Sequence, residues 1–174
     1  MKNLIITSVV CYLCFLSTNL NSTNFITLKY DSLSCLVIEG KISNLDDNID
    51  SECTVELMCL NKVIDSIVLK AGKKKFKFVL NKNLYYTIKI SKKGYVSKLV
   101  SIDTEILTEV SGVYQFAFET TLIEESISRK LNQDVLDFPV SIVQFDYEMG
   151  YFSYNKEYTI HIKKKLYHAE ASAH

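Results

Sequence analysis

Apolar and polar residues alternate along most of the chain, in short runs that turn-forming residues separate. In one such run Phe76, Phe78 and Leu80 alternate with more polar or smaller neighbours. A period of two buries one face of an extended strand and leaves the other face toward solvent. The pattern therefore predicts strands at residues 36–42, 53–60, 63–69, 75–80, 86–91, 96–102, 113–123, 140–147 and 151–154.

Turns are expected between these strands at intervals of roughly 8–12 residues, the spacing of a β-sandwich. Gly94 is expected to take a positive φ in its turn, and Gly40 within a strand suggests a bulge or a close approach of backbone. Helices do not alternate with the strands, which argues against a βαβ fold. The turns are expected at residues 61–62, 71–73, 81–83, 92–94 and 148–150.

The C-terminal part of the chain has a less regular pattern. Residues 124–136 are polar and fit a loop or a short helix. The tail from 157 to 173 fits a short terminal helix, although its first part alternates like a strand. We therefore expect a β-sandwich over residues 30–123, with a C-terminal hairpin and tail over residues 124–174 packed on or beside it.

Residues 1–22 carry the pattern of a secretory signal peptide. Lys2 precedes an apolar run from Leu4 to Leu16, and small polar residues follow. This run is shorter than the roughly 20 residues that a membrane-spanning helix needs. A short N-terminal anchor, a buried strand or lipidation at Cys11 are the alternatives. We expect an exported protein of the periplasm, outer membrane or cell surface, with no transmembrane span after signal removal.

The composition, 48% hydrophobic and 23% charged, is that of a protein with a real core and excludes a disordered tail, a collagen-like fibre and a coiled coil. The 20 basic and 20 acidic residues balance, so net charge does not favour nucleic acid as a partner. Beyond residue 22 the cysteines are Cys35, Cys53 and Cys59, and an odd number forms no complete disulfide framework. Buried thiols are the favoured interpretation, with one bridge involving Cys35 as the alternative.

Residue types that carry catalysis or bind metals are scarce in the expected sandwich. The histidines, His161, His168 and His174, all lie in the tail, so a Ser-His-Asp or Cys-His arrangement is not expected. Their spacing does not favour a metal site. The acidic segment 46–52 lacks the residue pattern of a calcium loop. We expect no catalytic residue, no cofactor and no metal.

Two groups of side chains are candidates for ligand binding. Tyrosines near the C-terminal hairpin can stack on sugars or peptides, although core or hairpin packing is the alternative. Lysines around one hairpin would attract an anionic glycan or a lipid headgroup, although they also solubilise a hairpin and protect a strand edge. The candidate residues are Tyr147, Tyr151, Tyr154, Lys73, Lys75 and Lys77.

Five short motifs together resemble the carboxypeptidase regulatory-like (transthyretin-like) domain of exported Bacteroidota envelope proteins. They cover most of residues 36–160. The resemblance implies an all-β fold, an Ig-like or transthyretin-like antiparallel β-sandwich. The motifs are an apolar-x-Gly-x-apolar strand at 38–42, a Tyr-x-apolar-x-apolar strand at 86–90, Lys-x-Gly-Tyr at 92–95, Asp-Thr at 103–104, and a Pro-Val hairpin at 139–154.

The resemblance and the signal segment imply a function in the cell envelope. We expect a non-catalytic exported module that acts by protein–protein contact, as an accessory to a larger envelope or secretion assembly. The expected partner is an envelope protein, and nucleic acid is not expected. A module that binds carbohydrate or another small ligand is the alternative. A hydrolase that uses paired acids at 134 and 137, or at 146 and 148, is a third and weaker hypothesis.

Overall fold

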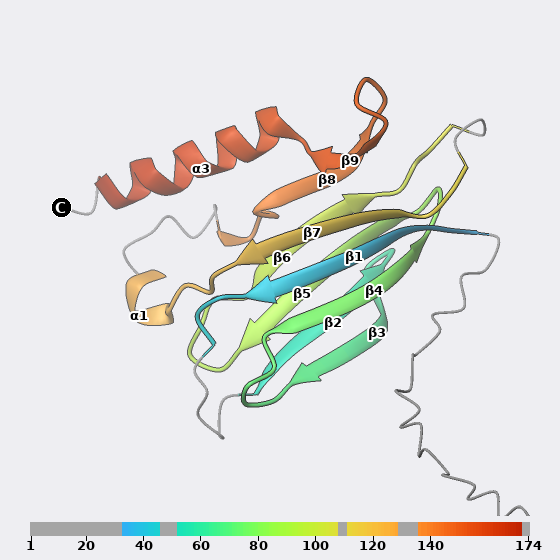
Figure 1. Cartoon of the computed structure of the whole chain (residues 1–174). Helices are drawn as coiled ribbons and strands as arrows, with labels where there is room; N and C mark the ends of the chain where they lie inside the picture. The colour runs from blue at the N-terminus through green and yellow to red at the C-terminus, as the bar shows by residue number, and fades with distance from the viewer. Residues whose placement is uncertain (1–32, 46–51, 108–110, 129–135, 172–174) are drawn as a thin grey trace, which may run out of the picture.

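A computed structural model describes residues 33–45, 52–107, 111–128 and 136–171. Two β-sheets face each other in this part of the chain, which confirms the expected all-β sandwich (Figure 1). The smaller sheet has the strand order β4-β1-β7, with β1 at Ser34–Ile42, β4 at Lys75–Asn81 and β7 at Tyr114–Thr120. The larger sheet has the order β3-β2-β5-β6-β8-β9, with β2 at Cys53–Cys59, β3 at Lys62–Leu69, β5 at Tyr85–Lys92, β6 at Lys98–Asp103, β8 at Ser141–Asp146 and β9 at Tyr151–Tyr154.

The core lies between the two sheets and consists of the alternating apolar side chains. Leu36 and Ile38 of β1 face Ile88 of β5 and Ile102 of β6, and all four are completely buried. In β5 and β6 the neighbours of these residues are only half-buried, as the period-two pattern predicted, whereas in β1 the neighbouring Cys35 and Val37 are buried as well.

Two neighbouring strand pairs run parallel, which differs from the purely antiparallel arrangement expected. β1 pairs with β7 in parallel, and so does β6 with β8, while the other pairs are antiparallel. The chain leaves the larger sheet after β6, adds β7 to the smaller sheet, and returns as β8 beside β6. Alternation shows which face of a strand is buried, but it carries no information about strand direction.

Gly40 in β1 lies directly opposite Phe76 in β4. A Cβ at position 40 would overlap the Phe76 ring, which also packs edge-on against Phe118 at 5.8 Å between ring centroids. The pairing register is continuous at Gly40, so the strand has no bulge there. The close approach expected from the sequence is therefore made by an aromatic side chain and not by backbone.

The turns fall close to their expected positions. Gly94 has a φ of +80°, which confirms the positive φ predicted for it. The turn between β2 and β3 is centred on Leu60 and Asn61, one residue earlier than expected, and both residues have positive φ. At the β4–β5 turn, the buried Thr104 hydroxyl accepts a hydrogen bond from the Leu84 amide at 3.0 Å.

The C-terminal segment extends the larger sheet. β8 pairs with β6, and β9 follows as the outermost strand on that side. A short helix, α1 at Glu125–Ser128, precedes β8. The tail is helical rather than extended: α3 spans Lys156–Ala171, longer than the short helix expected, and lies beside β8 (Figure 1). Among the described residues, no helix has the length and apolar character required to cross a bilayer.

The three cysteines of the described region are free thiols. Cys35 and Cys53 are buried in the core, and Cys59 is half-buried against it. Burial raises the pKa of Cys35 and of Cys53 to about 11. Buried apolar thiols, the favoured interpretation of the sequence, are thus what the structure has. The signal segment 1–22 and most of the acidic segment, residues 46–51, lie outside the described residues.

Candidate functional site

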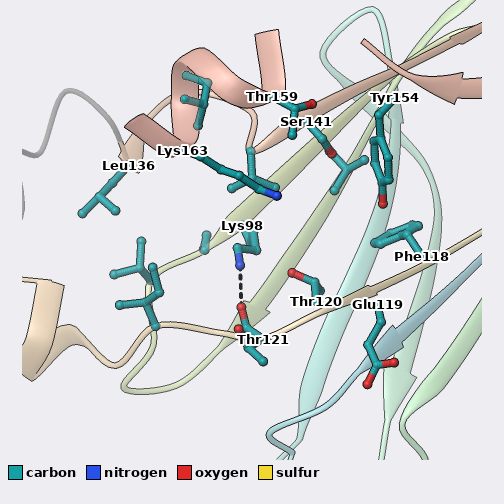
Figure 2. A pocket seen from close by; sticks show the side chains of 16 residues that line it. Lys98, Phe118, Glu119, Thr120, Thr121, Leu136, Ser141, Tyr154, Thr159 and Lys163 are labelled. Carbon is teal, nitrogen blue, oxygen red and sulfur yellow. Dashed lines mark hydrogen bonds between the residues drawn. The ribbon is translucent and has the colours of Figure 1, made fainter. Parts of the chain in front are cut away.

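A cavity of about 650 Å³ lies where the smaller sheet ends above the larger one (Figure 2). β7 packs on the C-terminal hairpin through Tyr114 and Phe116, which contact Phe145 and Tyr154. It ends at Thr120, and beyond this end the first residues of β6 and β8 are left uncovered and line the cavity. Helix α3 lies over this uncovered region and contributes Thr159, Ile162 and Lys163 to the cavity wall. The space is therefore bordered by two sheets and a helix, and it is partly open to solvent.

The walls of the cavity are largely apolar. Val100 of β6, Phe118 of β7 and Ile162 of α3 line it and are each more than nine-tenths buried. Ile123 and Val140, from the segments that flank β7 and β8, complete this apolar surface. The apolar part of a bound molecule could leave water and pack against these side chains.

Lys98 occupies a core-facing position at the start of β6. It pairs with Ile90 of β5, and it shares the inward face of its strand with the buried Val100. Its ammonium group donates a hydrogen bond to the carbonyl oxygen of Thr121 at 2.5 Å (Figure 2). Burial lowers the pKa of Lys98 because the charged form loses hydration.

Lys163 brings a second ammonium group to the same cavity. Its side chain extends from α3 toward the space that Lys98 lines (Figure 2). The one carboxylate in the wall, Glu119, is engaged elsewhere: it accepts hydrogen bonds from Lys41 at 2.9 Å and from the Ser43 hydroxyl at 2.5 Å. These contacts lower the pKa of Glu119. Of the described carboxylates, none forms an ion pair with Lys98 or Lys163.

Hydroxyl groups also line the cavity. Thr120 and the buried Ser141 line the cavity close to β6 and β8. Tyr154 of β9 also lines it, with its ring edge-on against Phe116 at 5.1 Å between centroids, and burial raises the pKa of its phenol. The cavity thus combines apolar walls with cations and neutral hydrogen-bonding groups.

The start of α3 is fixed by local hydrogen bonds. The Asn155 side chain accepts from the amide of Tyr158 at 3.0 Å, which is the geometry of a helix N-cap. The Tyr158 hydroxyl donates to the carbonyl of Pro139 at 2.8 Å. Ile162, one helical turn further, is buried against the sheet. These contacts hold Lys163 in place over the cavity.

The three candidate tyrosines do not form one surface. Tyr147 lies in the β8–β9 turn, where its hydroxyl accepts a hydrogen bond from the Leu107 amide at 3.2 Å and its ring packs against Phe145. Tyr151 is exposed at the start of β9. Only Tyr154 points inward, to the cavity.

The candidate lysines lie apart from the tyrosines. Lys73 is in the turn before β4, while Lys75 and Lys77 line a shallow hollow of about 560 Å³ on the smaller sheet. Lys77 pairs with Glu39 of β1 at 2.9 Å. Because β1 and β7 separate β4 from the C-terminal hairpin, the structure does not bring these lysines and the tyrosines together.

The described acids and histidines that were weighed as catalytic or metal-binding candidates do not line the cavity. Asp146 accepts hydrogen bonds from the amides of Glu148 at 3.1 Å and Met149 at 3.0 Å, and so closes the β8–β9 turn. His161 is exposed on α3. Asp134 lies outside the described residues. Within the described ranges, no group of three potential metal ligands is found.

Lys98 is the functional candidate that the sequence reasoning missed. Its signal was present in the chain, because Lys98, Val100 and Ile102 alternate and therefore share one strand face. A lysine on the core face of a strand is unusual, since burial of an unpaired charge is unfavourable. The exception marks the place where the core opens into a cavity.

Comparison with protein-family models finds no match to the chain, and comparison with curated protein sequences finds none either.

Proposed function

We propose that the protein is a non-catalytic, exported module of the cell envelope that acts by protein–protein contact. The observation that carries this proposal is the apolar edge of the larger sheet. β3, the outermost strand, exposes Val63, Ile64 and Val68, and the preceding turn exposes Leu60. We call these four residues the β3 edge.

The β3 edge combines two features of a protein-binding surface. An outermost strand presents backbone groups that can pair with a strand of another protein. Exposed apolar side chains gathered in one place mark interaction sites. The charged Lys62 and Asp65, and the irregular register near Ile64, limit unspecific pairing of this edge. The edge is therefore suited to a specific partner.

The location of the module is part of the same proposal. The signal-like segment 1–22 supports export to the periplasm, the outer membrane or the cell surface. The resemblance to carboxypeptidase regulatory-like domains of Bacteroidota envelope proteins supports a role as an accessory to a larger envelope or secretion assembly. The partner is then an envelope protein.

A non-catalytic role is consistent with the structural contacts of three acids, Asp146, Glu119 and Glu39. Asp146 closes a turn, and Glu119 and Glu39 pair with lysines on the outer face of the smaller sheet. These contacts stabilise the sandwich. This part of the proposal would be overturned if the protein turned over an ester, peptide or glycoside substrate and a single substitution abolished that activity.

Chemical cross-linking with an envelope fraction tests the β3 edge. We choose Ile64→Lys as the test variant and Ile160→Lys on α3 as its control, because the two isoleucines are 56% and 54% exposed. The unmodified protein and the Ile160→Lys variant are expected to give the same cross-linked partner, and Ile64→Lys to lose it. Equal cross-linking of both variants would contradict the proposal.

A small-ligand-binding module remains the second candidate, and the cavity favours it. A volume of about 650 Å³ falls within the roughly 300–1,000 Å³ typical of ligand pockets. From the sequence, the ligand was expected to bind to tyrosines of the C-terminal hairpin or to lysines around another hairpin. The cavity provides a more enclosed site, which includes only Tyr154 of those residues.

A further inference from the structure

We propose that the cavity between β6, β7, β8 and α3 binds an amphipathic anion, a small molecule with an alkyl body and a carboxylate or phosphate head. This inference deepens the second, ligand-binding candidate above and does not depend on the β3 edge. It rests on the placement of two lysines in an otherwise apolar and hydroxyl-lined space.

The head of the ligand would lie between the ammonium groups of Lys98 and Lys163. The hydrogen bond that Lys98 donates to the Thr121 carbonyl uses one of its three donors. Partial burial deprives the Lys98 ammonium group of hydration, which an anionic head would replace. Such a head can accept the remaining hydrogen bonds of the two ammonium groups.

The groups around the two lysines favour an anion over a cation or a sugar. Glu119, the carboxylate nearest in the wall, is held by Lys41 and Ser43. A bound cation would meet two ammonium groups and no uncommitted carboxylate of the described wall. Hydroxyl groups of Thr120 and Ser141 can donate further hydrogen bonds to an anionic head.

The body of the ligand would lie against the apolar walls. Val100, Phe118, Ile123 and Ile162 come from four different parts of the fold and face the same space. Transfer of an alkyl chain from water to such a surface is favourable in proportion to the apolar area buried. Both halves of the ligand therefore have a defined place in one cavity.

Calorimetric titration of the full chain with octanoate and octyl phosphate tests the proposal, with octanol and acetate as the two controls. Octanol keeps the body without the charge, and acetate keeps the charge without the body. We expect octanoate, octyl phosphate or both to bind, and each control to bind about tenfold or more weakly. The comparison of octanoate with octyl phosphate identifies the head.

Variants locate the site. Lys98→Met and Lys163→Met are each expected to weaken binding of the anion about tenfold. Lys164→Met is the matched control, because Lys164 is the exposed neighbour on the same helix and does not line the cavity. Since Lys163 is exposed, its replacement tests the site even if Lys98→Met affects folding.

Three results would overturn the inference. They are the failure of both alkyl anions to bind, octanol binding as tightly as octanoate, and an equal effect of Lys163→Met and Lys164→Met. None of them bears on the β3 edge, which the cross-linking of the Ile64 and Ile160 variants tests separately.

Discussion

At Gly40 the inner face of the smaller sheet has no room for a side chain, because the Phe76 ring lies directly over the backbone. Gly40→Ala is expected to destabilise the protein by about 1–3 kcal/mol, since the ring must move away from Phe118. This cost exceeds the roughly 0.5–1 kcal/mol that alanine normally gains over glycine in a strand. Denaturant unfolding measures the change.

Phe76→Leu in the Gly40→Ala background provides the control for this prediction. The smaller side chain leaves space for the new methyl group, so the double variant should lose less stability than the sum of the two single variants. Strict additivity of the two changes, or an unchanged midpoint for Gly40→Ala, would show that the ring does not occupy this position.

Cys35, Cys53 and Cys59 are expected to differ in their reactivity toward thiol reagents. Burial raises the pKa of Cys35 and Cys53 to about 11, so less of each thiol is deprotonated at a given pH. Among these three described cysteines, Cys59 is only half-buried and should react with a thiol reagent before Cys35 and Cys53. Peptide mass spectrometry over time distinguishes the three sites. Labelling of Cys53 as fast as Cys59 would contradict the packing described.

Among the elements, α3 begins at a residue that caps it. Asn155 caps the helix, and its side-chain amide also donates to Gln144 of β8 at 3.2 Å. Asn155→Ala is expected to lower stability by about 1 kcal/mol and to speed amide exchange at the start of α3. Lys156→Ala is the control, because Lys156 is exposed. Equal effects of the two substitutions would argue against the cap.

The strands could be predicted from the sequence because each buries one face, and the alternation of β4 and β5 records this directly. The helical state of the tail was ambiguous, because Tyr158, Ile160 and Ile162 alternate as in a strand. In the helix, Tyr158 and Ile162 lie one turn apart and dock its first half on the sheet, while Ile160 is exposed. The parallel pairs were beyond prediction, since a strand's direction depends on the path of the connections.

The candidate site followed from the sequence only in part. Tyr154 was recognised, and it does line the cavity. Lys98 was not predicted, although its alternation with Val100 and Ile102 places it on the buried face of its strand. Lys163 could not be assigned, because nothing in the tail shows that α3 lies above β6 and β8. A site built from separate elements requires the fold before its members can be grouped.

At the scale of the whole molecule, unequal sheets produce two distinct surfaces. Beyond the end of β7, α3 lies over the start of β6 and β8 and leaves a cavity. At the opposite side of the larger sheet, β3 is left as an apolar edge. These surfaces lie at different ends of one sheet, so a protein partner on β3 and a small ligand under α3 can bind independently.

The central claim is that the β3 edge is the surface that meets a protein partner. Amide hydrogen exchange in the cross-linked complex, compared with the free protein, measures this directly at both outer strands of the larger sheet. We predict slower exchange in β3, at residues Lys62–Leu69, and unchanged exchange in β9, at Tyr151–Tyr154. Protection confined to β9, or no change in β3, would contradict the account.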